Sequence, residues 1–248
     1  MSLSTTRVTS GDSVTVTPAT SGDLWGATYN YVWQRDGSWA RGDWGSTELF
    51  EGHGVPGALY RLRWASADGS ASGTLSDWSS ASSIWFNAST LGDCGDFYVV
   101  MDAMYPNGKT YSFTSGTVVY LTRAQRAVVN AAYRTGSYRG VSGWRAAWVS
   151  KVFAAAGYGW YGGNANDMYW AWCHSSNLSD LRAGMVIAVD KSPTRLGRIY
   201  GHIGIYVGNN LVRDDQGYVR EMTMRDWLNF YSQAGQPRWG WAGNVSLV

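Results

Sequence analysis

The hydrophobic pattern of the chain changes once, near Tyr120, and this change limits what the chain can fold into. Before it, short runs of β-branched and aromatic residues alternate with Gly, Ser, Asp and Pro, which is typical of strands joined by tight turns. After it, apolar residues first recur at helical spacing and then form shorter strand-like runs. The pattern therefore predicts two domains, residues 1–121 and 122–248.

The first domain is predicted to be an all-β, immunoglobulin-like sandwich. Such a sandwich has about seven short strands, and strand-like runs lie at 14–18, 29–33, 60–64, 83–86, 97–101 and 117–120. Asp-Gly and Asn-Gly dipeptides between the runs supply turns, because these residues tolerate positive φ. The domain has no cluster of Cys or His and no paired carboxylates, so we interpret it as a binding or spacer module.

The second domain is predicted to be α+β. Residues 122–133 indicate a helix with Thr122 as its N-cap, and residues 144–156 indicate a strongly apolar helix that ends at Gly157. Further strands are expected at 185–189, 201–208, 210–213 and 218–222, joined by tight turns. Two helices followed by an antiparallel meander form an α+β domain.

Three motifs of this domain carry a family resemblance. They are Gly-His-Ile-Gly-Ile-Tyr-Val-Gly at 201–208, Asp-Leu-Arg-Ala-Gly-Met-Val-Ile-Ala at 180–188 and Gly-Trp-Arg-Ala-Ala-Trp-Val-Ser-Lys-Val-Phe at 143–153. With them, residues 123–248 resemble the NlpC-type cell-wall peptidases, which are papain-like and related to the cysteine, histidine-dependent amidohydrolases and peptidases. The resemblance implies a papain-like fold and places the family's catalytic histidine at His202.

The resemblance also implies a cysteine at the start of the apolar helix, where the helix dipole lowers the pKa of the thiol and a histidine acts as base. This sequence has Arg145 there. Arginine stays protonated and is no nucleophile. We therefore expect a chain that is inactive as a hydrolase and binds cell-wall peptide. Cys173 follows an aromatic run instead of beginning this helix, so it is not expected to replace the nucleophile.

Two alternatives stay open for the function. In the first, the natural protein carries Cys at position 145 and is an active peptidoglycan endopeptidase or amidase. In the second, the aromatic-rich first domain binds the wall or a glycan, and the second domain is a scaffold.

A third site residue is implied in the segment that follows the histidine strand. We favour Asp215, with Asp214 or Arg213 as the alternative third residue. A carboxylate there would hold the tautomer of His202, or would instead pair with Arg145. Each aspartate could equally be a solvated turn residue before Gly217.

The chain is rich in aromatic residues, with 15 Trp and 16 Tyr. Such side chains pack cores or stack on glycans and peptides. Trp144, Trp160 and Tyr161 are the candidate ligand contacts, whereas Trp148, within the apolar helix, is expected in the core.

Charge and composition exclude several other classes. The formal charge is only +2, from 20 Lys+Arg and 18 Asp+Glu, with no basic run, so nucleic acid is not expected as a partner. Neither Cys94 nor Cys173 has metal-ligand spacing, so no metal or cofactor is expected; the two cysteines could form a disulfide. No apolar stretch reaches the ~20 residues of a membrane span. No signal peptide is recognisable, yet the family resemblance implies a secreted or wall-associated bacterial protein. Nothing indicates the oligomeric state.

Overall fold

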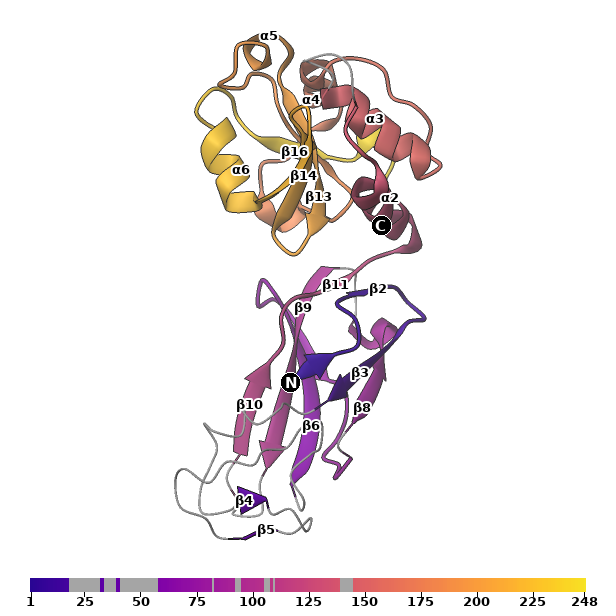
Figure 1. Ribbon diagram of the computed structural model, residues 1–248, viewed down its shortest axis with the longest axis vertical. Helices are drawn as coiled ribbons and strands as arrows, with labels where there is room; N and C mark the ends of the chain where they lie inside the picture. Colours follow the sequence, from indigo (N-terminus) through magenta and orange to yellow (C-terminus); the bar gives the residue numbers. More distant parts are fainter. Residues whose placement is uncertain are drawn as a thin grey trace. The chain divides into compact units, whose positions relative to one another are not determined.

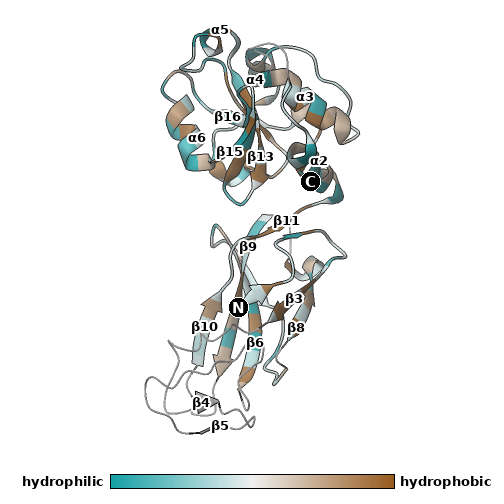
Figure 2. Cartoon of the chain, in the orientation of Figure 1, coloured by the Kyte–Doolittle hydropathy of each residue, from teal (hydrophilic) through white to brown (hydrophobic). Residues whose placement is uncertain are grey.

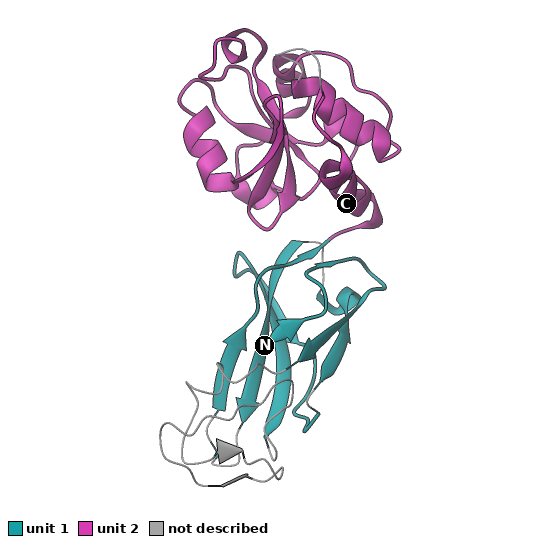
Figure 3. Cartoon of the chain, in the orientation of Figure 1, with its two compact units in different colours: residues 1–120 teal, residues 121–248 magenta. Residues whose placement is uncertain are grey.

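The computed structural model describes residues 1–17, 32–33, 39–40, 58–81, 83–91, 95–104, 108, 110–138 and 145–248. These residues belong to two compact units, Met1–Tyr120 and Leu121–Val248 (Figure 3). The predicted domain boundary, between residues 121 and 122, lies one residue from this division. Trp144, Cys94 and most of the predicted strand at 29–33 lie outside the described residues.

The first unit is built of β-strands (Figure 1). One sheet has the order β1-β3-β8, a second has the order β2-β11-β9-β6-β7 with β10 paired to β9, and β4 pairs with β5. The pairing of β2 with β11 is parallel. The elements are β1 (Ser2–Leu3), β2 (Arg7–Val8), β3 (Ser13–Thr17), β4 (Val32–Trp33), β5 (Trp39–Ala40), β6 (Leu59–Ser66), β7 (Ser72–Thr74), β8 (Ile84–Asn87), η1 (Ala88–Leu91), β9 (Gly95–Met104), β10 (Thr110–Thr114) and β11 (Val118–Tyr120).

Alternation along the strands produces one apolar core shared by the two larger sheets. Val14 and Val16 of β3 are fully buried, as is Leu62 of β6, and they belong to the same cluster. Side chains alternate between the two faces of a strand, so every second residue reaches the core. The all-β prediction therefore agrees with the described part of this unit, apart from the single turn of η1. Its immunoglobulin-like topology stays a prediction.

The second unit confirms the predicted α+β class. Its antiparallel sheet has the order β15-β14-β13-β12-β16. The strands are β12 (Val186–Val189), β13 (His202–Gly208), β14 (Leu211–Asp215), β15 (Val219–Thr223) and β16 (Arg238–Gly240). The helices are α2 (Arg123–Arg134), α3 (Arg145–Ala155), α4 (Ala165–Trp172), η2 (Leu178–Asp180), α5 (Gly197–Tyr200), α6 (Met224–Tyr231) and η3 (Ala242–Asn244). Helices α4, α5 and α6 and the strand β16 were not predicted from the sequence.

The two predicted helices form with the expected signals. Thr122 caps α2: its hydroxyl accepts a hydrogen bond from the backbone N–H of Gln125, whose side chain accepts from the N–H of Thr122. The Thr122 hydroxyl also donates to the carbonyl of Leu247, which joins the two ends of the unit. Trp148 of α3 is fully buried and donates to the carbonyl of Thr135, so its predicted core position is confirmed.

The strand β13 lies at the centre of the sheet and is buried along its whole length, and part of it has the brown, hydrophobic colour in Figure 2. Helix α3 packs against β13 and β14. The chain turns into β13 at Gly201, where φ is +72° and a Cβ atom would lie 2.4 Å from the carbonyl oxygen of Val189. Only glycine fits there, because both the positive φ and the close backbone exclude a side chain. This turn fixes where His202 begins the strand.

Candidate functional site

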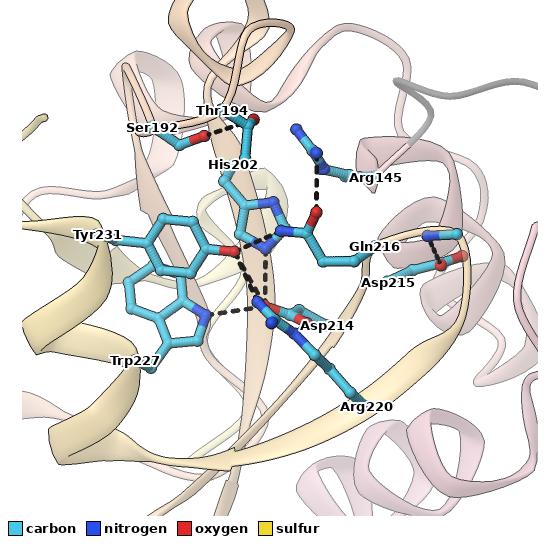
Figure 4. A network of polar contacts seen from close by, with 11 residues as sticks. Arg145, Ser192, Thr194, His202, Asp214, Asp215, Gln216, Arg220, Trp227 and Tyr231 are labelled. Carbon is cyan, nitrogen blue, oxygen red and sulfur yellow. Dashed lines mark hydrogen bonds and ion pairs between the residues drawn. The ribbon is translucent and has the colours of Figure 1, made fainter.

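A buried hydrogen bond between His202 and Asp214 forms the centre of the candidate site (Figure 4). The His202 Nε2 atom lies 2.7 Å from Asp214 Oδ2, and both side chains are fully buried. Asp214 pairs with Gly204 across β13 and β14. Because side chains alternate along a strand, Asp214 lies on the same face of the sheet as residues 204 and 202.

The structure thus brings the alternative third residue, Asp214, to His202, and not the favoured Asp215. Asp215 points to the opposite face of β14, where its carboxylate accepts hydrogen bonds from the Ser137 hydroxyl and from the backbone N–H groups of Tyr138 and Gly217, each at 2.8 Å. It therefore neither orients His202 nor pairs with Arg145. It is also 3% exposed, so the solvated-turn alternative is wrong for it.

Arg213, the other alternative, also lies outside this site. Its Nη1 atom donates to Glu221 Oε2 at 3.2 Å, and its guanidinium lies over the ring of Tyr133, 4.3 Å from the centroid. The alternation that places Asp214 beside His202 places Arg213, like Asp215, on the other face.

Four donors besides His202 converge on Asp214. Arg220 of β15 donates from Nε at 2.7 Å and from Nη2 at 3.1 Å, and Trp227 and Tyr231 of α6 donate at 3.1 and 3.4 Å. Burial alone would raise the pKa of Asp214, but the hydrogen bonds and charges of His202 and Arg220 outweigh it and lower the pKa to about 2. Asp214 is therefore a carboxylate throughout the neutral range.

His202 is held neutral in this surrounding. Burial lowers its pKa, Asp214 acts in the opposite direction, and the charges of Arg145 and Arg220 lower it further. Because Asp214 is ionised, Nε2 carries the proton and donates it to the carboxylate. Nδ1 is then an unprotonated acceptor, and it is buried without a hydrogen-bond partner among the described residues. The ring is stacked on Tyr231, with centroids 4.4 Å apart.

Arg145, the first residue of α3, lies on the opposite side of the His202 ring from Asp214 (Figure 4). Its Nη2 atom donates to Gln216 Oε1 at 2.8 Å, and Gln216 in turn donates to the Tyr231 hydroxyl at 2.6 Å. Burial lowers the pKa of Arg145, but a guanidinium remains charged in proteins. Within the described residues no carboxylate contacts it. The position implied for a nucleophile thus carries a cation.

Four contributors to the site were missed from the sequence: Gln216, Arg220, Trp227 and Tyr231. A signal for two of them was present. Thr223 and Asp226 form an N-cap pattern, and the hydroxyl of Thr223 accepts from the N–H of Asp226. The aromatic residues Trp227 and Tyr231 follow at an i, i+4 spacing, which puts both on one face of a helix.

The aromatic ligand-contact candidates have different surroundings. Trp160 is exposed, with 55% of its surface accessible. Tyr161 packs between Phe153 and Trp172, at centroid distances of 5.6 and 5.1 Å. Trp144 lies outside the described residues.

The thiol of this unit is unsuited to nucleophilic attack. Cys173 is a free, buried cysteine, so it is not joined to Cys94, and burial raises its pKa to about 12. In the described part of the chain, no group of three or more His, Cys, Asp and Glu side chains could hold a metal ion, and no helix is long and apolar enough to cross a membrane. The site holds a buried base with no nucleophile among its described contacts.

Comparisons with known proteins give a distant likeness. No protein-family model matches the chain, and no curated protein does. Among solved structures, the chain is similar to NlpC1 from Trichomonas vaginalis, with 12% identity over 81% of this chain and 73% of that one and a TM-score of 0.37. It is also similar to NlpC2 from the same organism, with 13% identity over 75% and 72% and a TM-score of 0.33. At this level neither protein sets a role for any residue here.

Proposed function

We propose that this chain is a peptidoglycan-binding protein of the NlpC type that does not cleave its ligand. Its second domain would be papain-like and would hold a stem peptide or wall glycan. Its first domain would be an immunoglobulin-like binding or spacer module. The protein would be bacterial and secreted or wall-associated. The observation that carries the proposal is the guanidinium of Arg145 on the side of the His202 ring away from Asp214, where the family would carry a thiol.

The chemistry supports binding over hydrolysis. A cysteine hydrolase needs a thiolate at the N-terminus of the helix and a histidine that takes its proton. Here His202 and Asp214 have the geometry of a base and its orienting carboxylate, whereas Arg145 supplies a fixed positive charge. A cation beside a buried neutral imidazole attracts an electronegative ligand group but forms no covalent bond with it.

The test is incubation of the full chain with purified peptidoglycan and with model stem peptides. We expect the chain to sediment with the insoluble wall, and we expect no new amino groups to appear. Turnover by the wild-type chain that disappears in His202→Ala would show that the chain is an enzyme. If the chain instead remains in the supernatant, the proposed wall-binding function is wrong.

The intact His202–Asp214 pair favours one second candidate, an active form with cysteine at position 145. The variant Arg145→Cys tests it. If this candidate is right, the variant gains a thiol that reacts with iodoacetamide near neutral pH, and it hydrolyses stem peptides. A reactive thiol without hydrolysis would show that the rest of the site no longer supports the reaction.

A further inference from the structure

Two groups on the side of the His202 ring away from Asp214 have unused hydrogen-bonding capacity (Figure 4). His202 Nδ1 is fully buried and has no partner in the described part of the chain. Arg145 has five N–H donors, and its described hydrogen bond uses only Nη2, which donates to the neutral Gln216. A buried polar atom without a partner is unfavourable, so Nδ1 indicates a place for a ligand atom.

Polar capacity on the other side of His202 is already used. Asp214 accepts from Nε2 and from Arg220, Trp227 and Tyr231. Arg220 and Asp214 compensate each other's charge in this contact. A ligand is therefore expected only on the side of Nδ1 and Arg145.

The positive charge of Arg145 is available to a ligand, because the nearby carboxylates are engaged by other groups. Asp214 and Asp215 act on it from a distance, but Asp214 is held by Arg220, and Asp215 is engaged by a hydroxyl and two backbone N–H groups. The first turn of α3, which has 11 residues, adds the positive end of a helix dipole and N–H groups without intrahelical partners. The ligand group is thus expected to be anionic.

The neutral state of His202 adds a second requirement. Its Nδ1 presents a lone pair, so the ligand group that meets it must carry a proton or bind together with one. A carboxyl group satisfies both sides at once. One oxygen accepts from Arg145, and the other shares a proton with Nδ1, either as a carboxylic acid or as a carboxylate beside an imidazolium. Both descriptions contain the same atoms and the same single proton.

We propose that the side of His202 facing Arg145 binds a carboxylate with uptake of one proton from solvent, so that His202 Nδ1 and the Arg145 guanidinium hold its two oxygens. The inference rests on the proposed function, in which the carboxylate is that of a wall peptide. The cation of Arg145 attracts a carboxylate, whereas a thiolate at the same position would repel it.

Proton uptake follows from the groups around His202. His202 contacts Asp214 of β14 and Tyr231 of α6, and it pairs with Val189 of β12. The charges of Arg220 on β15 and of Arg145 on α3 also act on it. In the free protein, burial and the two guanidinium groups keep the pKa of His202 low. A bound carboxylate compensates Arg145 and favours the charged imidazolium, so the pKa of His202 rises on binding.

The experiment is calorimetric titration of the full chain with acetate, between pH 5 and 8, in two buffers of different ionisation enthalpy. Where His202 is neutral in the free chain and charged in the complex, we expect about one proton to be taken up and the Kd to rise about tenfold per pH unit. Phosphate and acetamide are the comparison probes. Acetamide has the same shape without the charge, and phosphate has a different geometry and a higher charge. Equal binding of either, acetate binding without proton uptake, or no binding would overturn the inference.

Two matched variants locate the site. Arg145→Gln removes the charge and should weaken acetate binding at least about tenfold, the scale of one lost charge-assisted contact. Arg225→Gln removes a guanidinium that is 80% exposed on α6 and should leave the Kd unchanged. Equal effects of the two variants would contradict the site. Thermal unfolding of both checks that they are folded, and the proton uptake of the wild-type chain tests the inference without any variant.

The inference and the proposed function can fail separately. If the chain binds acetate with proton uptake but does not sediment with peptidoglycan, the wall function is wrong and the carboxylate site stands. If Arg145→Gln loses acetate binding but still sediments with the wall, the wall ligand is held elsewhere, and the assignment of its carboxylate to this site is overturned.

Discussion

The contrast between Asp214 and Asp215 tests the site most directly. The two carboxylates are adjacent in β14, and both are buried, yet only Asp214 contacts His202 and a guanidinium. Each can be changed to asparagine, which keeps the shape and removes the charge. We expect the two variants to differ in stability and, above all, in their effect on His202.

The magnitude follows from the partners that each variant leaves behind. Removing one member of a buried ion pair costs about 3–5 kcal/mol. Asparagine keeps one oxygen that can still accept from His202, so Asp214→Asn is expected near the lower end, about 3 kcal/mol, which lowers the Tm of a domain of this size by about 10 °C. The remaining cost arises at the half-buried Arg220. Its Nε–H donates to Asp214 Oδ1, and in the variant it would face the N–H donors of an amide instead.

Asp215→Asn removes charge-assisted hydrogen bonds but leaves no cation unpaired, so its expected cost is smaller, about 2 kcal/mol. It should not change the pKa of His202. Asp214→Asn should lower that pKa further, because the carboxylate that favours the imidazolium is gone.

The assay is urea unfolding at pH 7, combined with nitrogen NMR of the imidazole ring across a pH series. The NMR signals report the protonation of His202 directly, which a purely structural effect would not move. A cost below about 1 kcal/mol for Asp214→Asn, against the 3–5 kcal/mol of a broken buried pair, would refute the reasoning. So would an equal shift of the His202 pKa in the two variants.

Three further predictions follow from the second unit. Gly201→Ala should cost at least about 3 kcal/mol in thermal unfolding, because the added Cβ atom clashes with backbone and the residue is strained at positive φ. Gly217→Ala is the control: its φ is +94°, but no atom lies near the added Cβ, so only the strain of about 1 kcal/mol is expected. Equal costs would contradict the close packing at Gly201. The free energy of unfolding should fall as the pH drops below about 6.5, because the folded state lowers the pKa of His202 and the unfolded chain binds more protons. It should fall by a further ~2 kcal/mol between about pH 4 and 2, because the pKa of Asp214 is also lowered in the folded state. A flat acid profile in urea titrations would exclude this. Cys173 should resist iodoacetamide at pH 8 in the folded chain, because its thiol is buried and its pKa is raised, and it should react in urea. Labelling is measured by peptide mass. Fast labelling of the native chain would show that the thiol is accessible.

The sequence alone predicted the elements whose signals are local. The cap at Thr122, the apolar composition of α3 and the apolar run of β13 each depend on neighbouring residues, and the two helices and the strand are all present. Helices α4 and α6 were missed because each has only eight residues, about two turns, over which a helical period is hard to recognise.

The candidate site was only partly predictable for a different reason. Whether Asp214 or Asp215 faces His202 depends on the register of β14 against β13, and a shift by one residue exchanges the two faces. The same holds for Arg220, which reaches Asp214 only because β15 pairs with β14 in its observed register. Pairing register is a property of two distant segments, so inspection of either segment could not supply it.

The order of contacts along the chain affects how this unit folds during synthesis. Both β16, the partner of β12, and Leu247, the partner of Thr122, are synthesised long after the segments that they contact. Synthesis proceeds from the N-terminus, so β12 emerges from the ribosome about 50 residues before β16 can pair with it, and domains generally fold as units. Until then, the fully apolar β12 presents an unpaired edge, which is a hazard for aggregation. The nascent second unit is therefore expected to expose this edge until β16, residues 238–240, has emerged, and chains truncated before residue 238 should accumulate as insoluble protein.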